Sequence, residues 1–168
     1  MSGFAVATML EIDVIVESTQ WGALPDAQAV ARNAIAQALA ALKARPDAEF
    51  AVLLTDDAAI RRLNATWRGL DKPTNVLSFP AAEVPDSPHL GDIAIAFETT
   101  AREAKDEGKP LANHLAHLAV HGFLHLAGYD HESDAEAETM EQLERDILAR
   151  LNVADPYLAP MSAEATGV

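Results

Sequence analysis

Five of the six histidines fall within one short stretch of the chain, and three of them form the pattern His121-x-x-x-His125-x-x-Gly128-x-x-His131. Residues four apart on a helix lie on the same face, so the first two imidazoles can converge on one ion. A glycine permits the left-handed turn that ends many helices, and such a turn would fold the chain back toward the pair. The pattern predicts a helix over residues 111–126, a turn at the glycine, and a cluster of three imidazoles.

Three neutral imidazoles with a fourth position open to water are typical of a catalytic zinc site. The alternative is a set of ordinary core or surface histidines, which a His-x-x-x-His pair alone would favour and the third histidine disfavours. We therefore expect one Zn2+ ion per chain, bound by His121, His125 and His131. His117 lies one turn before His121, and we expect it to contact a ligand rather than the ion.

The composition excludes several classes of function. The 168 residues contain no cysteine, which excludes disulfide-linked partners, thiolate metal sites and cysteine nucleophiles. The longest apolar stretches are shorter than the ~20 residues of a membrane-spanning helix, and no Lys/Arg-led apolar secretion signal precedes them. We expect one domain over residues 9–153, flexible ends at 1–8 and 154–168, and no membrane partner.

The rest of the chain alternates between strand and helix patterns. Helices are expected from about Pro25 to Pro46 and over residues 99–107 and 133–151, the last opened by a Ser133–Glu136 capping box. A further helix can be capped by Thr55 and Asp56, with Ile60 and Leu63 among its apolar positions. Residues 81–90 contain two prolines and read as an exposed excursion. The expected strands cover residues 10–17, 50–54, 75–79 and 93–97. This order predicts an α/β (α+β) fold with a small mixed sheet of about four strands covered by helices.

The spacing of the three histidines also occurs in metzincin proteases. In those enzymes a glutamate directly after the first histidine is the general base, whereas this chain has Gly122, which cannot accept a proton. That difference weakens a zinc metallopeptidase-like alternative. Asp130 and Glu132 flank His131 and could orient a ligand or move a proton, although carboxylates at a helix N-terminus can equally be solvated surface groups.

The motif HGFLHLAGYDH at residues 121–131 resembles the signature of the YbeY family, the bacterial ribosomal-RNA maturation endoribonucleases. The similarity extends from about residue 9 to about residue 153. Three further segments match the family's order and spacing: Leu63-Asn64-Ala-Thr-Trp67-Arg68-Gly69, Lys72-Pro73-Thr74-Asn75-Val76-Leu77-Ser78-Phe79-Pro80 and Gly91-Asp92-Ile93.

The resemblance implies a small α/β fold, a zinc ion on the three histidines and a functionally important arginine that matches Arg68. The planar guanidinium suits phosphate oxygens, although Arg68 could instead anchor a surface loop. Thr74 and Ser78 border the same loop and strand, where their hydroxyls could contact phosphate or be purely structural. The family usually has aspartate where this chain has Asn75, which keeps an acceptor but loses the charge.

The leading hypothesis is a cytoplasmic, zinc-dependent endoribonuclease specific for single-stranded RNA. The resemblance implies that it acts in processing of the 3′ end of small-subunit (16S) ribosomal RNA and in late ribosome quality control. Its partners would be ribosomal RNA and the small ribosomal subunit with associated factors. Either water or the ribose 2′-hydroxyl could be the nucleophile. A ribosome-associated binding factor with a structural zinc is a further alternative.

The net charge of −14 disfavours nucleic-acid binding at first sight. The charges are uneven, however, because residues 43–72 hold 6 basic and 5 acidic side chains while residues 111–168 hold 2 and 10. A local field depends on nearby charges and the metal itself. We expect weak binding of free RNA, with help from the ribosome or a partner. A weakly basic patch beside the metal is expected at Arg61, Arg62, Arg68 and Lys72.

Overall fold

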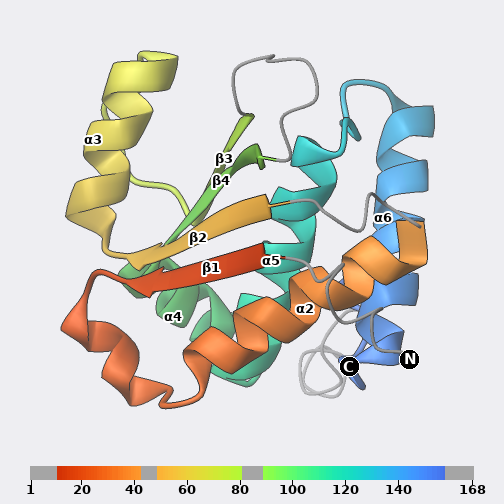
Figure 1. Ribbon diagram of the computed structural model, residues 1–168, viewed down its shortest axis with the longest axis horizontal. Coiled ribbons are helices and arrows are strands. Elements are labelled where there is room, and N and C mark those ends of the chain that lie inside the picture. The colour runs from red at the N-terminus through yellow and green to blue at the C-terminus, as the bar shows by residue number, and fades with distance from the viewer. Residues whose placement is uncertain (1–10, 43–48, 81–88, 158–168) are drawn as a thin grey trace, which may run out of the picture.

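The computed structural model describes residues 11–42, 49–80 and 89–157 (Figure 1). Strands and helices alternate in the first part of these ranges, whereas the second part has two consecutive strands followed by three helices. In chain order the elements are β1 (Glu11–Val16), the 3-10 helix η1 (Thr19–Ala23), α2 (Ala27–Leu42), β2 (Glu49–Thr55), α3 (Asp57–Arg68), β3 (Val76–Pro80), β4 (His89–Ala96), α4 (Phe97–Asp106), α5 (Leu111–Leu126) and α6 (Asp134–Arg150).

The four strands form one mixed sheet in the order β1-β2-β4-β3. Strands β1, β2 and β4 run parallel, whereas β3 is antiparallel to β4 and lies at an edge. The inner strands carry fully buried β-branched and leucine side chains, including Val52, Leu54, Ile93 and Ile95. Such apolar runs are typical of strands covered on both faces. The predicted small mixed sheet of about four strands is thus confirmed.

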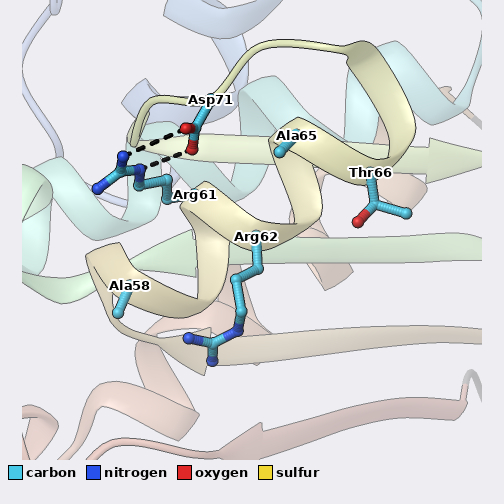
Figure 2. Close-up of a pocket in the computed structure, with 6 residues that line it drawn as sticks. All are labelled: Ala58, Arg61, Arg62, Ala65, Thr66 and Asp71. Atoms are coloured by element: carbon cyan, nitrogen blue, oxygen red, sulfur yellow. Dashed lines mark hydrogen bonds and ion pairs between the residues drawn. The ribbon is translucent and has the colours of Figure 1, made fainter.

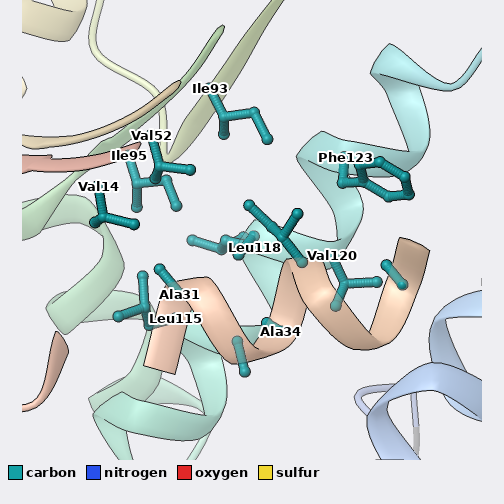
Figure 3. Packing of buried hydrophobic residues seen from close by; sticks show 14 of the residues in the cluster. Val14, Ala31, Ala34, Val52, Ile93, Ile95, Leu115, Leu118, Val120 and Phe123 are labelled. Carbon is teal, nitrogen blue, oxygen red and sulfur yellow. The ribbon is translucent and has the colours of Figure 1, made fainter. Parts of the chain in front are cut away.

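Helices cover both faces of this sheet. Helices α2 and α5 pack on one face with α6 outside them, and α3 covers the opposite face (Figure 1). Ile60 of α3 packs in a small apolar cluster with Leu77 and Ala94. The larger cluster fills the space between the sheet and the first helix layer (Figure 3) and includes Val14, Ala31, Ala34, Val52, Ile93, Ile95, Leu115, Leu118, Val120 and Phe123. None of the described helices is long and apolar enough to cross a membrane.

Helix α5 spans Leu111–Leu126, as the histidine pattern predicts. The apolar side chains in the middle of this helix are buried, and each large one contributes ~1.5–3 kcal/mol relative to exposure. The helix is capped by Ala127, and Gly128 adopts a φ of 101°, in the left-handed region that glycine tolerates best. The predicted turn is confirmed, and the imidazole-bearing side of α5 is therefore held by a packed core.

Helix α6 begins at the predicted capping box, two residues after His131. The Ser133 hydroxyl accepts from the backbone N–H of Glu136 at 3.1 Å, and the Glu136 carboxylate accepts from the N–H of Ser133 at 3.2 Å. The capping box thus satisfies two of the backbone N–H donors at this helix end. The turn that carries His131 is therefore fixed at both ends, by Gly128 and by the cap.

Two predicted boundaries are wrong. The strand expected over residues 93–97 begins at His89, inside the expected excursion, because β4 pairs with both β2 and β3. Phe97 starts α4 instead of ending the strand. The remainder of the excursion, residues 81–88, lies outside the described residues. The sequence reading also does not predict η1, which Ser18 caps and in which Trp21 is buried.

The ends expected to be flexible fall largely outside the described residues. Residues 154–157 are described, and they return to α6. Arg145 donates to Asp155 across 3.0 Å, and the Tyr157 hydroxyl donates to the Glu144 carboxylate. This part of the C-terminal segment therefore packs beside α5 and α6.

Candidate metal centre

A pocket opens beside the C-terminal part of α5 and reaches β3 and the end of α3. It is lined by Arg68, Asn75, Val76, Leu77, Ser78, Pro80, His121, His125, Asp130 and His131. The three predicted ligands, the predicted arginine and two other candidates thus share one pocket. Its lining does not include five further candidates, which are Arg61, Arg62, Lys72, Thr74 and His117.

The three predicted ligands converge as their spacing requires. His121 and His125 lie one turn apart on α5, and their Nε2 atoms are 3.1 Å apart. His131 follows the glycine turn, and one nitrogen from each of the three rings lies within 4.8 Å of the others. These residues could therefore hold one metal ion, although a His-x-x-x-His pair alone would not define a site.

Hydrogen bonds at the opposite nitrogens fix how the two α5 rings meet. The Nδ1 of His121 is 2.5 Å from a carboxylate oxygen of Glu144, and that of His125 is 3.1 Å from the carbonyl oxygen of Tyr129. Both partners accept hydrogen bonds, so each Nδ1 carries the proton and donates. The two facing Nε2 atoms then present lone pairs to each other.

Two facing lone pairs are the arrangement that a cation between them stabilises. Nitrogen ligands ~2.0–2.1 Å from a tetrahedral ion such as zinc lie ~3.3 Å apart, close to the 3.1 Å between the two Nε2 atoms. Burial, together with the neighbouring His121 and His131, lowers the pKa of His125. The neutral imidazole that metal binding requires is therefore favoured, and the donor set fits a metal ion.

Glu144 lies directly behind the first of these ligands. Its side chain is 0% exposed, and its carboxylate faces the rings of His117 and His121 and the Tyr157 hydroxyl. Burial alone would raise its pKa, but these three hydrogen bonds outweigh burial and hold the pKa at about 2. Burial and the same carboxylate raise the pKa of Tyr157 well above its usual range. Glu144 is thus a buried anion that accepts from three donors.

A second group, formed by His117, His121 and Glu144, also lies close enough for a shared ion. The 2.5 Å between Nδ1 of His121 and the Glu144 oxygen is a hydrogen-bond distance. It is well below the ~3.3 Å that separates two ligands of a tetrahedral ion. This group is therefore a hydrogen-bonded cluster, and the pocket histidines are the better metal site.

Arg68 approaches the pocket from the last turn of α3. The helix ends there because Gly69 adopts a left-handed φ of 71°. The Asn64 side chain donates to the carbonyl oxygen of Lys72 at 2.9 Å, and this hydrogen bond holds the loop that follows the helix. Arg68 is exposed, and within the described part of the chain it makes no hydrogen bond or ion pair. Its guanidinium is thus free to bind an anion beside the histidines.

Asn75, at the position where the family resemblance implies aspartate, belongs to a hydrogen-bonded chain. Its amide donates to Glu103 at 2.9 Å, and its oxygen accepts from the N–H of Val76 at 2.7 Å. The same Glu103 oxygen lies 2.9 Å from Nε2 of His114. A carboxylate at position 75 could not donate to Glu103, so the asparagine suits this chain's packing.

Ser78 joins the edge strand to the metal-site helix. Its hydroxyl donates to the carbonyl of Gly122 at 2.8 Å. Gly122 packs so closely that an added Cβ would lie 2.9 Å from Ile93 Cγ2 and 3.2 Å from the Ser78 hydroxyl. The hydroxyl proton of Ser78 is therefore committed to holding β3 against α5.

Arg61 and Arg62 line a different hollow on the outer face of α3 (Figure 2). Arg61 makes two contacts with Asp71, at 2.7 and 3.3 Å, which raise the pKa of Arg61 and lower that of Asp71. Arg62 points away from that pair (Figure 2). Lys72 is exposed on the following loop. Arg61 and Arg62 thus line a hollow separate from the histidine pocket, whereas Arg68 is the one of the four expected basic residues that lines that pocket.

The two residues expected to contact the ligands occupy different places. Nε2 of His117 lies 3.4 Å from Glu144, and the ring packs edge-on to His121. Asp130 lines the pocket and accepts from the backbone N–H of His131 at 2.7 Å. His117 therefore reaches the ligands through Glu144, while Asp130 shapes the turn that carries the third ligand.

Sequence reasoning missed Glu144 and Tyr157. Glu144 falls between Met140 and Ile147 on the apolar stripe of α6, where all three side chains are buried. A charged residue on such a stripe requires a hydrogen-bonding partner, so the position carried a usable signal. Tyr157 lies beyond the last helix pattern and carried none.

Comparison with known proteins gives a consistent assignment. The family model described as Endoribonuclease YbeY matches residues 15–152. The chain is 62% identical over 152 residues to the Endoribonuclease YbeY of Rhodopseudomonas palustris strain BisA53, covering 86% of this chain and 88% of that protein. It is 59% identical over 156 residues to the protein of the same name from Nitrobacter winogradskyi, covering 88% and 82%.

A solved structure has the same fold. The solution structure of a protein from Thermotoga maritima superimposes with a TM-score of 0.52 at 25% sequence identity. The match covers 88% of this chain and 99% of that one. The arrangement of sheet and helices is therefore shared along nearly the whole length of both proteins.

Proposed function

The chain belongs to the YbeY family of endoribonucleases, and from that premise we propose a zinc-dependent endoribonuclease that cuts single-stranded RNA. We place its action in maturation of the 3′ end of small-subunit ribosomal RNA and in late ribosome quality control, in the cytoplasm. His121, His125 and His131 are the proposed ligands of one zinc ion, and Arg68 is the proposed catalytic arginine.

The observation that carries this proposal is the 3.1 Å distance between the Nε2 atoms of His121 and His125, beside a third imidazole. An all-imidazole set with a position left for water is the donor set of catalytic zinc. Zinc supplies Lewis acidity toward a phosphate oxygen and lowers the pKa of water bound to it. The ring hydrogen bonds to Glu144 and Tyr129 keep His121 and His125 oriented for that ion.

Arg68 supplies the positive charge that faces the substrate. Its guanidinium can donate two parallel hydrogen bonds to the non-bridging oxygens of a phosphodiester. No acidic side chain among the described residues is paired with it, so this charge is available when negative charge develops in the transition state. Arg68 thus stabilises the reacting phosphate from within the pocket that the histidines line.

The pocket does not favour a peptidase. The base glutamate of a metzincin would occupy position 122, but a side chain there would point at Ile93, Ser78 and Val76. Its Cβ would already lie 2.9 Å from Ile93 Cγ2 and 3.3 Å from Val76 Cγ2, so a glutamate could not be accommodated there without displacing its neighbours. A proton acceptor for peptide hydrolysis is therefore missing from the position where that chemistry would require it.

The charge distribution favours recognition of RNA within a larger particle. The chain carries a net charge of −14, and Arg68 is the basic residue lining the described pocket. Few phosphates can therefore be neutralised, so free RNA should bind weakly and with a shallow salt dependence. We propose the small ribosomal subunit and its associated factors as the partners that present the RNA.

The test uses purified wild-type protein and the variant His125→Ala on a single-stranded RNA and its duplex. We expect one zinc ion per wild-type chain by elemental analysis, cleavage of the single strand only, and loss of both metal and cleavage in His125→Ala. A metal-free variant with full activity would contradict the proposal. A substrate with deoxyribose at the cut site separates the two nucleophiles, because attack by water does not need the 2′-hydroxyl.

A further inference from the structure

The two oxygens of the buried Glu144 carboxylate have different hydrogen-bond partners. One oxygen accepts from Nδ1 of His121 across 2.5 Å. The other accepts from the Tyr157 hydroxyl and lies 3.4 Å from Nε2 of His117. Every partner of this anion is therefore a neutral donor or an imidazole.

No Lys or Arg in the described ranges forms an ion pair with Glu144. The neighbouring Arg145 reaches past it, pairs with Asp155 at 3.0 Å, and lies 5.3 Å from the centre of the Tyr157 ring. Arg145 therefore holds the C-terminal segment in place instead of neutralising Glu144. Because an unpaired buried charge is costly, this carboxylate needs positive charge from the direction of His121.

The three proposed ligands differ in the hydrogen-bond partner of the ring nitrogen that faces away from the metal. His121 donates to a carboxylate, and His125 donates to the neutral carbonyl of Tyr129. The His131 ring makes no hydrogen bond within the described residues. A carboxylate acceptor fixes the ring and raises the basicity of the opposite nitrogen more than a carbonyl does.

We propose that Glu144 is the positioning residue of the metal centre, which orients His121 and strengthens its Nε2 as a ligand. Tyr157, held by Arg145, keeps the carboxylate in place from the C-terminal segment. This inference rests on the metal site of the proposed function, because Glu144 is assigned the role of orienting one of the proposed zinc ligands, His121. Tight zinc binding would then require Glu144 in addition to the three histidines.

The decisive variant is Glu144→Gln, which keeps the size of the side chain and removes its charge. We expect the zinc dissociation constant, measured by competition with a chromophoric chelator, to rise ~10- to 100-fold. The ring nitrogen NMR shifts of His121 should move away from the Nδ1-protonated form. The matched control is Glu138→Gln, an exposed carboxylate on the same helix, which should change neither measurement.

Tyr157→Phe provides a second test that leaves the core intact, because Tyr157 is 40% exposed. Loss of the hydroxyl removes one hydrogen bond to a Glu144 oxygen. Zinc affinity should therefore fall, but by less than in Glu144→Gln. Unchanged zinc affinity and unchanged His121 shifts in both variants would overturn the inference.

The two proposals fail in distinguishable ways. If wild-type protein binds zinc, His125→Ala does not, and Glu144→Gln binds as tightly as wild type, then the positioning role is wrong and the metal site stands. If wild-type protein binds no zinc, the metal site is wrong and the positioning role falls with it.

Discussion

His121 and Arg68 line the same pocket, but their surroundings differ in almost every respect. His121 lies on a helix packed in the core, and its ring is held by the fully buried Glu144. Arg68 lies on the last turn of α3, is exposed, and has no polar partner among the described residues. One side of the pocket is fixed before any ligand arrives, and the other is free to adjust.

The difference follows from what each side has to bind. A metal ion requires its ligands within ~0.2 Å of their ideal distances, which only a packed and hydrogen-bonded framework can maintain. A phosphate on a flexible strand presents several equivalent oxygens, so an unpaired guanidinium can find them from more than one rotamer. Rigidity on the histidine side and freedom on the arginine side therefore suit the two tasks.

The largest expected effect is that of Arg68→Ala. Removing one donor to the transition state costs ~2.7–4 kcal/mol, or ~100- to 1000-fold in kcat. Zinc content and the unfolding midpoint should stay close to the wild-type values, because Arg68 is exposed and makes no hydrogen bond or ion pair with the described residues. Single-turnover cleavage of RNA, with elemental analysis on the same sample, measures both. A variant that loses its zinc as well would show that the two sides are not independent.

The packed side can be challenged through Gly122→Ala. The new methyl group would lie 2.9 Å from Ile93 Cγ2 and 3.3 Å from Val76 Cγ2, and such overpacking costs ~1–3 kcal/mol. Alanine returns ~0.8–1.0 kcal/mol of helix propensity, so we expect a net loss of up to ~2 kcal/mol in the free energy of unfolding and weaker zinc binding.

Chemical denaturation checks this expectation, with Gly22→Ala as its control. No atom lies within 4 Å of a Cβ built at Gly22, so that variant should unfold at the wild-type midpoint or slightly above it. If Gly122→Ala is as stable as the control and binds zinc normally, α5 is less tightly held against the sheet than its contacts indicate.

A smaller effect on stability is expected from Asn75→Asp, a change at a residue that lines the pocket. The new carboxylate cannot donate to Glu103, which already accepts from this amide at 2.9 Å. The lost hydrogen bond and the like charge should lower the free energy of unfolding by ~1 kcal/mol, near the low end for a partly exposed site. Asn75→Ala is the comparison, since it removes the donor without adding charge. An aspartate variant more stable than the alanine variant would contradict the repulsion.

The amino-acid sequence predicts the ligand side of the site better than its surroundings. Periodicity and a glycine turn are local signals, and they suffice to place α5 and its three histidines. Glu144 lies 23 residues from His121 along the chain, and their contact depends on how α6 packs against α5. The start of β4 at His89 likewise depends on pairing with β2 and β3, which no local pattern encodes.

The same reason explains why local sequence patterns, without the family resemblance, do not distinguish the arginines of α3. Arg61 and Arg68 are seven residues apart, about two turns of a helix, and no local pattern shows which of them has an acidic partner. The structure separates them, because Asp71 folds back onto Arg61 across 2.7 Å and leaves Arg68 without an acidic partner. The loop after α3 therefore determines, through Asp71, that Arg68 and not Arg61 keeps an unpaired positive charge.

The smallest expected effects come from this Arg61–Asp71 pair. Arg61→Ala should leave the cleavage rate at the wild-type level and lower RNA affinity only slightly, since it leaves the Asp71 carboxylate unpaired outside the histidine pocket. Asp71→Asn should act in the opposite direction by releasing Arg61. RNA should then bind more tightly, with a salt dependence steeper by at most about one phosphate contact. Binding titrations at several salt concentrations measure both variants. If Arg61→Ala impairs cleavage as severely as Arg68→Ala, then the two arginines act on the same RNA and the division between the paired and the free cation is wrong.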